Sequence, residues 1–149
     1  SKATPENIWE MIIEFDHMLA DWAHGGMCEK FMSHTRPRGY DYNKKYYHVL
    51  AYNKNLFPHP HPTYRVEIGE DHDMNLQLLT RGCGNFVLTE YANDDKSHAP
   101  GGCEEWRNPD LELQEALKLC ELFPGIVTHV KGPNVRIAWK KAAKIGGLL

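Results

Sequence analysis

The chain has 149 residues, of which 42% are hydrophobic and 25% charged, and its formal net charge is −3 at pH 7. These values are typical of an ordinary globular protein and exclude a disordered chain. The length suits one hydrophobic core, so we expect residues 1–149 to form a single globular domain. No run of 18 apolar residues is present, so we expect no membrane span.

The first predicted element is a helix that starts after Thr4. Thr4 suits the N-cap position, Pro5 suits the first helical position, and apolar residues then recur at helical spacing as far as Trp22. Gly25 and Gly26 interrupt this pattern. Residues 27–32 are compatible with one or two further helical turns.

The middle of the chain predicts strands. Residues 46–52 and the "TYRVEI" segment, residues 63–68, alternate between two faces as half-buried strands do. A turn is expected at residues 70–73. Residues 75–91 predict a hairpin whose turn holds Gly82 and Gly84 and whose second arm is residues 86–91.

The last third predicts one clear helix over residues 109–123, with Asn108 as its N-cap and Pro124-Gly125 as its stop. The "IVTHV" segment, residues 126–130, predicts a short strand, and the tail from residue 134 suits a strand or a short amphipathic helix. The order of elements predicts an α+β fold. In it, the N-terminal helix packs on an antiparallel sheet and a second helix lies near residues 109–123.

The four cysteines are Cys28, Cys83, Cys103 and Cys120, and none of them forms a CxxC pair. A structural zinc site is therefore not expected. An even number of cysteines in a small chain suits two disulfides, with three connectivities open. Two disulfides would indicate an oxidising compartment, and a start at Ser1 suits a processed chain. We expect a secreted protein; four buried thiols in a cytosolic protein are the alternative.

The charges are distributed unevenly along the chain. Residues 131–149 carry five basic residues and no acidic one, whereas acidic residues gather between Glu67 and Asp110. Residues 36–45 carry four basic residues among several tyrosines, a composition that suits stacking on bases and holding phosphates. A bipolar surface can hold a polyanion on one side. The alternative is that these charges form solvated faces.

Acid–base cleavage of RNA needs few protein groups. A base acts on the 2′-hydroxyl, an acid protonates the leaving 5′-oxygen, and cations surround the phosphoryl oxygens. Side chains from adjacent strands of one sheet face can converge to supply these groups. The candidates are Tyr46, His48, Arg65, Glu67, Arg81 and His129.

Three short segments resemble secreted fungal guanyl-preferring ribonucleases and ribotoxin-like proteins. They are "YYHVLAY" with Tyr46 two residues before His48, "TYRVEI" with Glu67, and "GIVTHVKG" with His129. The resemblance implies that Glu67 is the base, that His129 is the acid, and that Tyr46 and His48 act beside the phosphate. The family places an arginine on the strand before the last histidine, where this chain has a helical pattern. Arg65, Arg81 and Arg107 remain open for that role.

A divalent metal site is a further possibility. Asp71, His72 and Asp73 form a dense group of potential ligands, and they would matter in a metal-dependent ribonuclease. The acid–base hypothesis itself requires no cofactor. We therefore expect a monomeric endoribonuclease that acts on RNA or the ribosome. A non-enzymatic secreted module that binds a glycan, a nucleic acid or a protein is the alternative.

Overall fold

A computed structural model describes residues 3–94 and 107–149 of the chain. The helices are α1 (Pro5–Leu19), α2 (Lys30–Ser33), α3 (Glu70–Thr80), α4 (Pro109–Leu122), α5 (Trp139–Ile145) and the short 3-10 helix η1 (Lys54–Leu56). The strands are β1 (His24–Glu29), β2 (Tyr40–Tyr42), β3 (Tyr47–Tyr52), β4 (Asn85–Asn93), β5 (Val127–Lys131) and β6 (Asn134–Ile137). This content confirms the α+β class. Within the described ranges, no helix is both long and apolar enough to cross a membrane.

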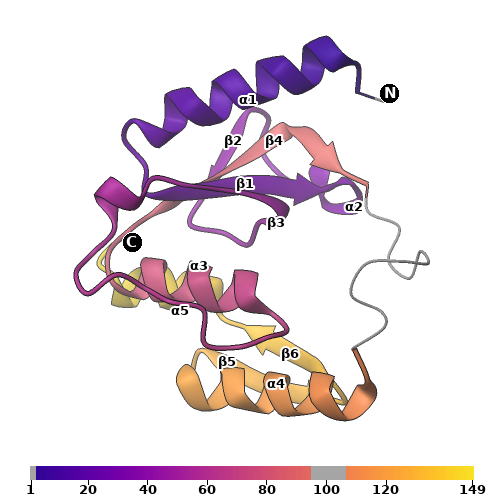
Figure 1. The fold of residues 1–149 in the computed structure, drawn as a ribbon, viewed down its shortest axis with the longest axis vertical. Helices are drawn as coiled ribbons and strands as arrows, with labels where there is room; N and C mark the ends of the chain where they lie inside the picture. The colour runs from indigo at the N-terminus through magenta and orange to yellow at the C-terminus, as the bar shows by residue number, and fades with distance from the viewer. Residues whose placement is uncertain (1–2, 95–106) are drawn as a thin grey trace.

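The elements are stacked in layers (Figure 1). A four-stranded sheet, in the order β2-β4-β1-β3, carries α1 on one face. Helices α3 and α5 lie on the other side of the sheet, and α4 with the β5-β6 hairpin forms the layer beyond them. Strand β1 runs parallel to β4, whereas the pairs β1-β3 and β2-β4 are antiparallel. The sheet is thus mixed rather than wholly antiparallel.

Strand β4 connects two cores because its side chains alternate between the faces of the sheet. Phe86 and Leu88 pack with Phe15 of α1, while Val87 packs on the opposite face with Cys28 and Tyr46. Helix α1 starts where the sequence predicts, because the Thr4 side chain accepts a hydrogen bond from Asn7 in a capping box.

Strand β1 takes residues 27–29 of the segment that suggested further helical turns, whereas residues 30–32 are helical as part of α2. The glycines of β1 explain the difference. A Cβ on Gly25 would lie 2.4 Å from the Phe86 ring, and one on Gly26 would lie 2.6 Å from Tyr46 Cβ. The two glycines are therefore positions where large aromatic side chains pack against the backbone of a central strand. They interrupt the helical pattern because they belong to the sheet.

Helix α3 occupies residues for which a turn and the first arm of a hairpin were predicted, and that prediction is wrong. The helix is central, so it is buried on more than one side. Met74 and Leu78 pack toward the sheet, and Leu76 and Leu79 pack toward α4 and α5. A helix covered on several sides loses the one-sided apolar pattern by which helices are recognised. The second arm, residues 86–91, is confirmed as part of β4.

The segment at residues 63–68 is also not a strand. It runs without regular secondary structure into Gly69, whose left-handed φ of 82° precedes α3. The helix predicted over residues 109–123 and the strand predicted over residues 126–130 are confirmed as α4 and β5. The tail from residue 134, for which a strand or a short helix was expected, contains both, as β6 and α5.

The described cysteines do not form the expected disulfides. Cys28, Cys83 and Cys120 are free thiols, and Cys28 is fully buried with its thiol near the Tyr91 carbonyl. Cys103 lies outside the described residues. The two predicted disulfides are therefore absent from the part of the chain that the structure describes, and secretion stays a prediction.

Candidate functional site

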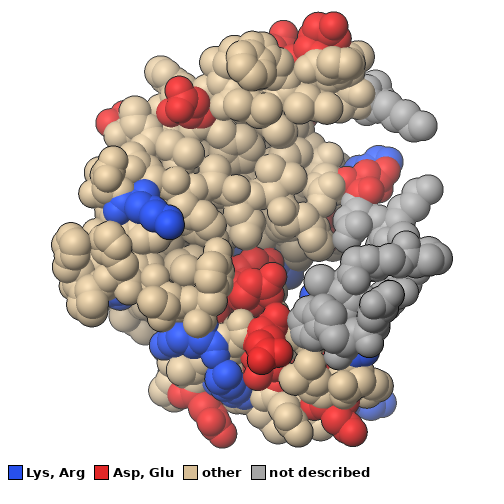
Figure 2. Space-filling model, viewed as in Figure 1, with Lys and Arg blue, Asp and Glu red and all other residues tan. Residues whose placement is uncertain are grey.

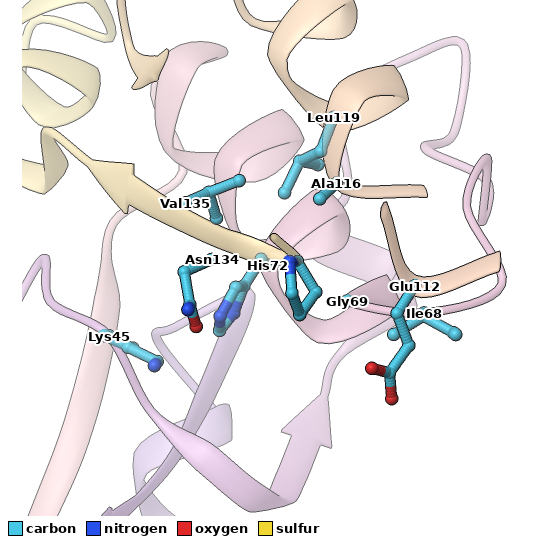
Figure 3. Close-up of a pocket in the computed structure, with 10 residues that line it drawn as sticks. Lys45, Ile68, Gly69, His72, Glu112, Ala116, Leu119, Asn134 and Val135 are labelled. Atoms are coloured by element: carbon cyan, nitrogen blue, oxygen red, sulfur yellow. The ribbon is translucent and has the colours of Figure 1, made fainter. Parts of the chain in front are cut away.

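A cavity of about 330 Å³ lies where α3 begins, between α4, the β5-β6 turn and the segment that leads into β3 (Figure 3). Its polar side chains come from elements far apart in the sequence. Lys45, His72 and Asn134 point into the same space, and Glu112 stands at the rim near Ile68. The other lining residues are Gly69, Ala116, Leu119, Pro133 and Val135.

The backbone beside Lys45 is held by buried amides. Asn75 of α3 and Asn85 of β4 both donate to the Lys44 carbonyl, at 3.2 and 2.8 Å, and Asn85 also donates to Asn75 at 2.7 Å. The Arg36 guanidinium donates to the Lys45 carbonyl at 3.0 Å. Because these partners are largely buried, they fix the backbone of Lys45 next to the first turn of α3.

The Lys45 ammonium is a partly desolvated cation. It lies 3.7 Å from the centroid of the Tyr47 ring, a geometry that favours a positive charge. Burial lowers the pKa of Lys45, while Asp71 and Glu29 raise it in part. Burial also raises the pKa of the Tyr47 hydroxyl to about 12. The Lys45 side chain, with its pKa lowered by burial, therefore lies beside a phenol that is neutral at neutral pH.

His72 is arranged as a neutral imidazole. Its Nδ1 lies 3.2 Å from the Asp71 carboxylate, and its ring meets Trp139 edge-on at 5.8 Å between centroids. Burial lowers the pKa of His72; Asp71 raises it and Lys45 lowers it further. The Asp71 carboxylate accepts a hydrogen bond from the His72 backbone N–H at 2.7 Å, and its closeness to Nδ1 favours a proton on that nitrogen. The Nε2 lone pair is then available for general-base chemistry.

The combination supplies acid–base chemistry next to a fixed cation. A neutral histidine can take a proton, a lysine can stabilise negative charge or give a proton, and the Asn134 amide can donate a hydrogen bond. The cavity is at the small end of the range for small-molecule sites, which suits a group of nucleotide size.

The predicted site residues do not share one sheet face. His48 lies on β3 of the four-stranded sheet with its Nε2 3.8 Å from Glu29, and His129 lies on β5 of the separate hairpin with its Nε2 bonded to the Gly132 carbonyl at 2.8 Å. Glu67 lies outside any strand, and its backbone N–H donates to the buried Glu115 carboxylate. The expectation that these groups converge from adjacent strands is wrong.

Tyr46 is also not a surface group beside a phosphate. It is 1% exposed, and its hydroxyl lies 2.8 Å from Nδ1 of His24, which is itself fully buried. The alternation of residues 46–52 suggested a shared face for Tyr46 and His48, but His48 has a left-handed φ of 53° at an irregularity of the β1-β3 pairing. The bulge separates the two side chains.

Of the three candidate arginines, Arg107 is exposed, and the other two have structural partners. Arg65 binds the fully buried carboxylate of Asp73, and Arg81 donates to the Pro60 carbonyl at 2.7 Å. Asp73 also accepts from Gln77 at 3.0 Å, so this aspartate faces inward, away from a shared metal site with Asp71 and His72. Over residues 3–94 and 107–149, no group of three or more potential metal ligands is found.

From the sequence, His72 was expected only as a metal ligand and Lys45 only as part of a phosphate-holding segment, and neither Asn134 nor Glu112 was predicted. Nothing local marks these last two, because they reach the cavity only through the packing of α4 and the β5-β6 turn. Comparisons with protein-family models, curated proteins and solved structures give no match to this chain.

Proposed function

We propose that the chain is an RNA-cleaving enzyme whose acid–base site is the cavity lined by Lys45 and His72, with Asp71 beside His72. The observation that carries this proposal is an imidazole of lowered pKa, 3.2 Å from the Asp71 carboxylate, that faces the same small cavity as the half-buried Lys45 side chain. The proposal keeps the reaction that the residue types suggested. It assigns the reaction to the cavity that Lys45 and His72 share, instead of to His48, Glu67 and His129.

The reaction follows from the roles that the geometry allows. His72 Nε2 takes the proton of the 2′-hydroxyl, the 2′-oxygen attacks the phosphorus, and the bond from phosphorus to the 5′-oxygen breaks. The Lys45 ammonium lies beside the phosphoryl oxygens and gives a proton to the leaving 5′-oxygen. The products are a 2′,3′-cyclic phosphate and a free 5′-hydroxyl, with no covalent intermediate on the protein.

The test is cleavage of single-stranded RNA by the full chain and by two histidine variants, with and without EDTA. We expect His72→Gln to lower the rate by roughly 10²-fold or more. His129→Gln is the matched control, because His129 is exposed and lies outside the cavity; it should cleave at the wild-type rate.

Three results would overturn the proposal. Absence of cleavage under both conditions excludes RNA cleavage. Loss of activity only in EDTA points instead to the metal-dependent reaction. Loss of cleavage in His129→Gln together with normal cleavage by His72→Gln would place the active site at the β5-β6 hairpin instead of the cavity.

A further inference from the structure

Helix α1 carries two apolar faces, and only one of them packs on the sheet. The inner face contributes Phe15 to the core, with Met11, Met18 and Leu19 packed around it. The outer face exposes four large apolar side chains, which are 46–63% exposed: Ile8, Trp9, Ile12 and Ile13. Their spacing places them along one side of the helix. A contiguous apolar stripe of this kind marks an interaction surface more often than isolated apolar residues do.

A row of acidic side chains follows this stripe. Glu6, Glu10 and Glu14 are four residues apart, so they lie one above the other on the helix. Residues 3–23 contain five acidic residues and no lysine or arginine. Figure 2 shows acidic and no basic groups over α1 in this view. A partner for α1 must therefore offer apolar side chains beside positive charges.

The C-terminal helix of the same chain has these properties. Lys140 and Lys144 of α5 are exposed and also four residues apart, and the neighbouring Ile145 is 56% exposed. Lys141 is less available, since it donates to the Gly125 carbonyl at 2.9 Å. A pair of lysines beside the exposed Ile145 thus matches the spacing of a pair of glutamates beside the apolar stripe of α1.

One copy of the chain cannot make this contact with itself. Helix α1 covers one face of the four-stranded sheet and α5 lies beyond the other (Figure 1). We propose that the outer face of α1 binds the α5 surface of a second copy of this chain. The two surfaces differ, so the contact is head-to-tail and can repeat from copy to copy. The proposal is independent of the proposed function and replaces the expectation of a monomer.

The test uses two charge-reversed variants in sedimentation equilibrium. Variant one is Glu6→Lys with Glu10→Lys, and variant two is Lys140→Glu with Lys144→Glu. Wild-type protein should increase in mass with concentration, and about 0.5 M salt should weaken the association. Each variant alone should be monomeric, because both of its surfaces carry the same sign. An equimolar mixture should associate again, since each reversed surface then meets an opposite charge.

Two controls separate this contact from general effects. Asp110→Lys with Glu121→Lys reverses two exposed charges on α4 and should associate as the wild type does. Trp9→Ala should weaken association at least tenfold if the stripe is buried in the contact. Thermal melting checks that every variant is folded. Monomeric wild type up to about 1 mM, or folded variants that associate alone but do not pair in the mixture, would overturn the proposal.

Discussion

Arg65 binds the carboxylate of Asp73 through its backbone N–H, at 3.0 Å, and through its guanidinium. Asp73 is fully buried in the first turn of α3, while the Arg65 side chain is one-third exposed. The pair ties the irregular segment at residues 58–69 to the helix. It thereby sets where α3 begins, and with it the position of Asp71 and His72.

Asp73→Asn should destabilise the fold by about 2–3 kcal/mol, because it leaves a guanidinium facing a buried neutral amide. Urea unfolding at neutral pH measures this free energy. Asp94→Asn is the matched control: its ion pair with Lys30 is 65% exposed on both sides, so its loss should change stability by less than about 0.5 kcal/mol. Equal effects of the two changes would contradict this account.

His24 should make the protein sensitive to moderate acid. Tyr46 donates to its Nδ1 and its Nε2 donates to the Cys83 carbonyl at 3.0 Å, so the neutral ring is satisfied. Burial lowers the pKa of His24 to about 4 from its ordinary 6.5. Between these values only the unfolded state binds the proton, so stability is lost as pH falls from 6.5 to 4, by about 3 kcal/mol.

Urea unfolding at several pH values tests this assignment. His24→Gln should be less stable than the wild type at pH 7, because the variant loses the packing of the buried ring. Between pH 6.5 and 4, however, its free energy of unfolding should fall less steeply with pH, because the contribution of His24 is absent. His17→Gln changes an exposed histidine of α1 and should keep the wild-type slope. An unchanged slope in His24→Gln would show that other groups cause the acid sensitivity.

Gly25 should not tolerate a side chain, because its Cβ would overlap the Phe86 ring. We expect Gly25→Ala to cost about 1–3 kcal/mol of stability. Phe86→Leu makes space at that point and should also destabilise when introduced alone. The double variant should lose less than the two single losses together, a coupling that a thermodynamic cycle measures. Simple additivity would mean that the two positions do not compete for space.

The features that could be predicted from the sequence are those that depend on neighbouring residues. Thr4 and Asn108 cap α1 and α4 through hydrogen bonds within four residues, so both helix starts could be predicted. Position 25 requires glycine because the Phe86 ring, sixty-one residues away in the sequence, packs against its backbone. A short sequence window does not reveal this contact. The pairing of β1 with β4 was therefore not foreseen.

The site was missed for the same reason. Lys45 reaches the cavity because Asn75 and Asn85 hold the Lys44 carbonyl, and these two asparagines carry no pattern of their own. His129 was conspicuous as a polar residue within a short apolar run, yet its ring Nε2 is hydrogen-bonded to the Gly132 carbonyl of its own hairpin turn. Residue type and spacing thus suggested acid–base chemistry, which stays a prediction, but they could not indicate which residues packing brings together at the proposed site.

The pH dependence of the proposed site gives the last prediction. Cleavage needs neutral His72 and protonated Lys45, so the rate should rise with pH through a pKa below 6.5 and fall through a pKa below 10.5. Asp71 raises the pKa of His72 and Lys45 lowers it. Asp71→Asn should therefore move the acidic limb to lower pH, and Lys45→Gln should move it to higher pH.

Titration of the histidine ring signals by NMR measures the same shifts without any activity. The pKa read from the His72 signal should fall in Asp71→Asn and rise in Lys45→Gln. If the His72 pKa shifts in opposite directions in the two variants but the protein does not cleave RNA, the electrostatic coupling of these residues is supported. Only RNA as the substrate is then excluded. Shifts of the same sign, or none, would mean that Lys45, Asp71 and His72 do not act on one another.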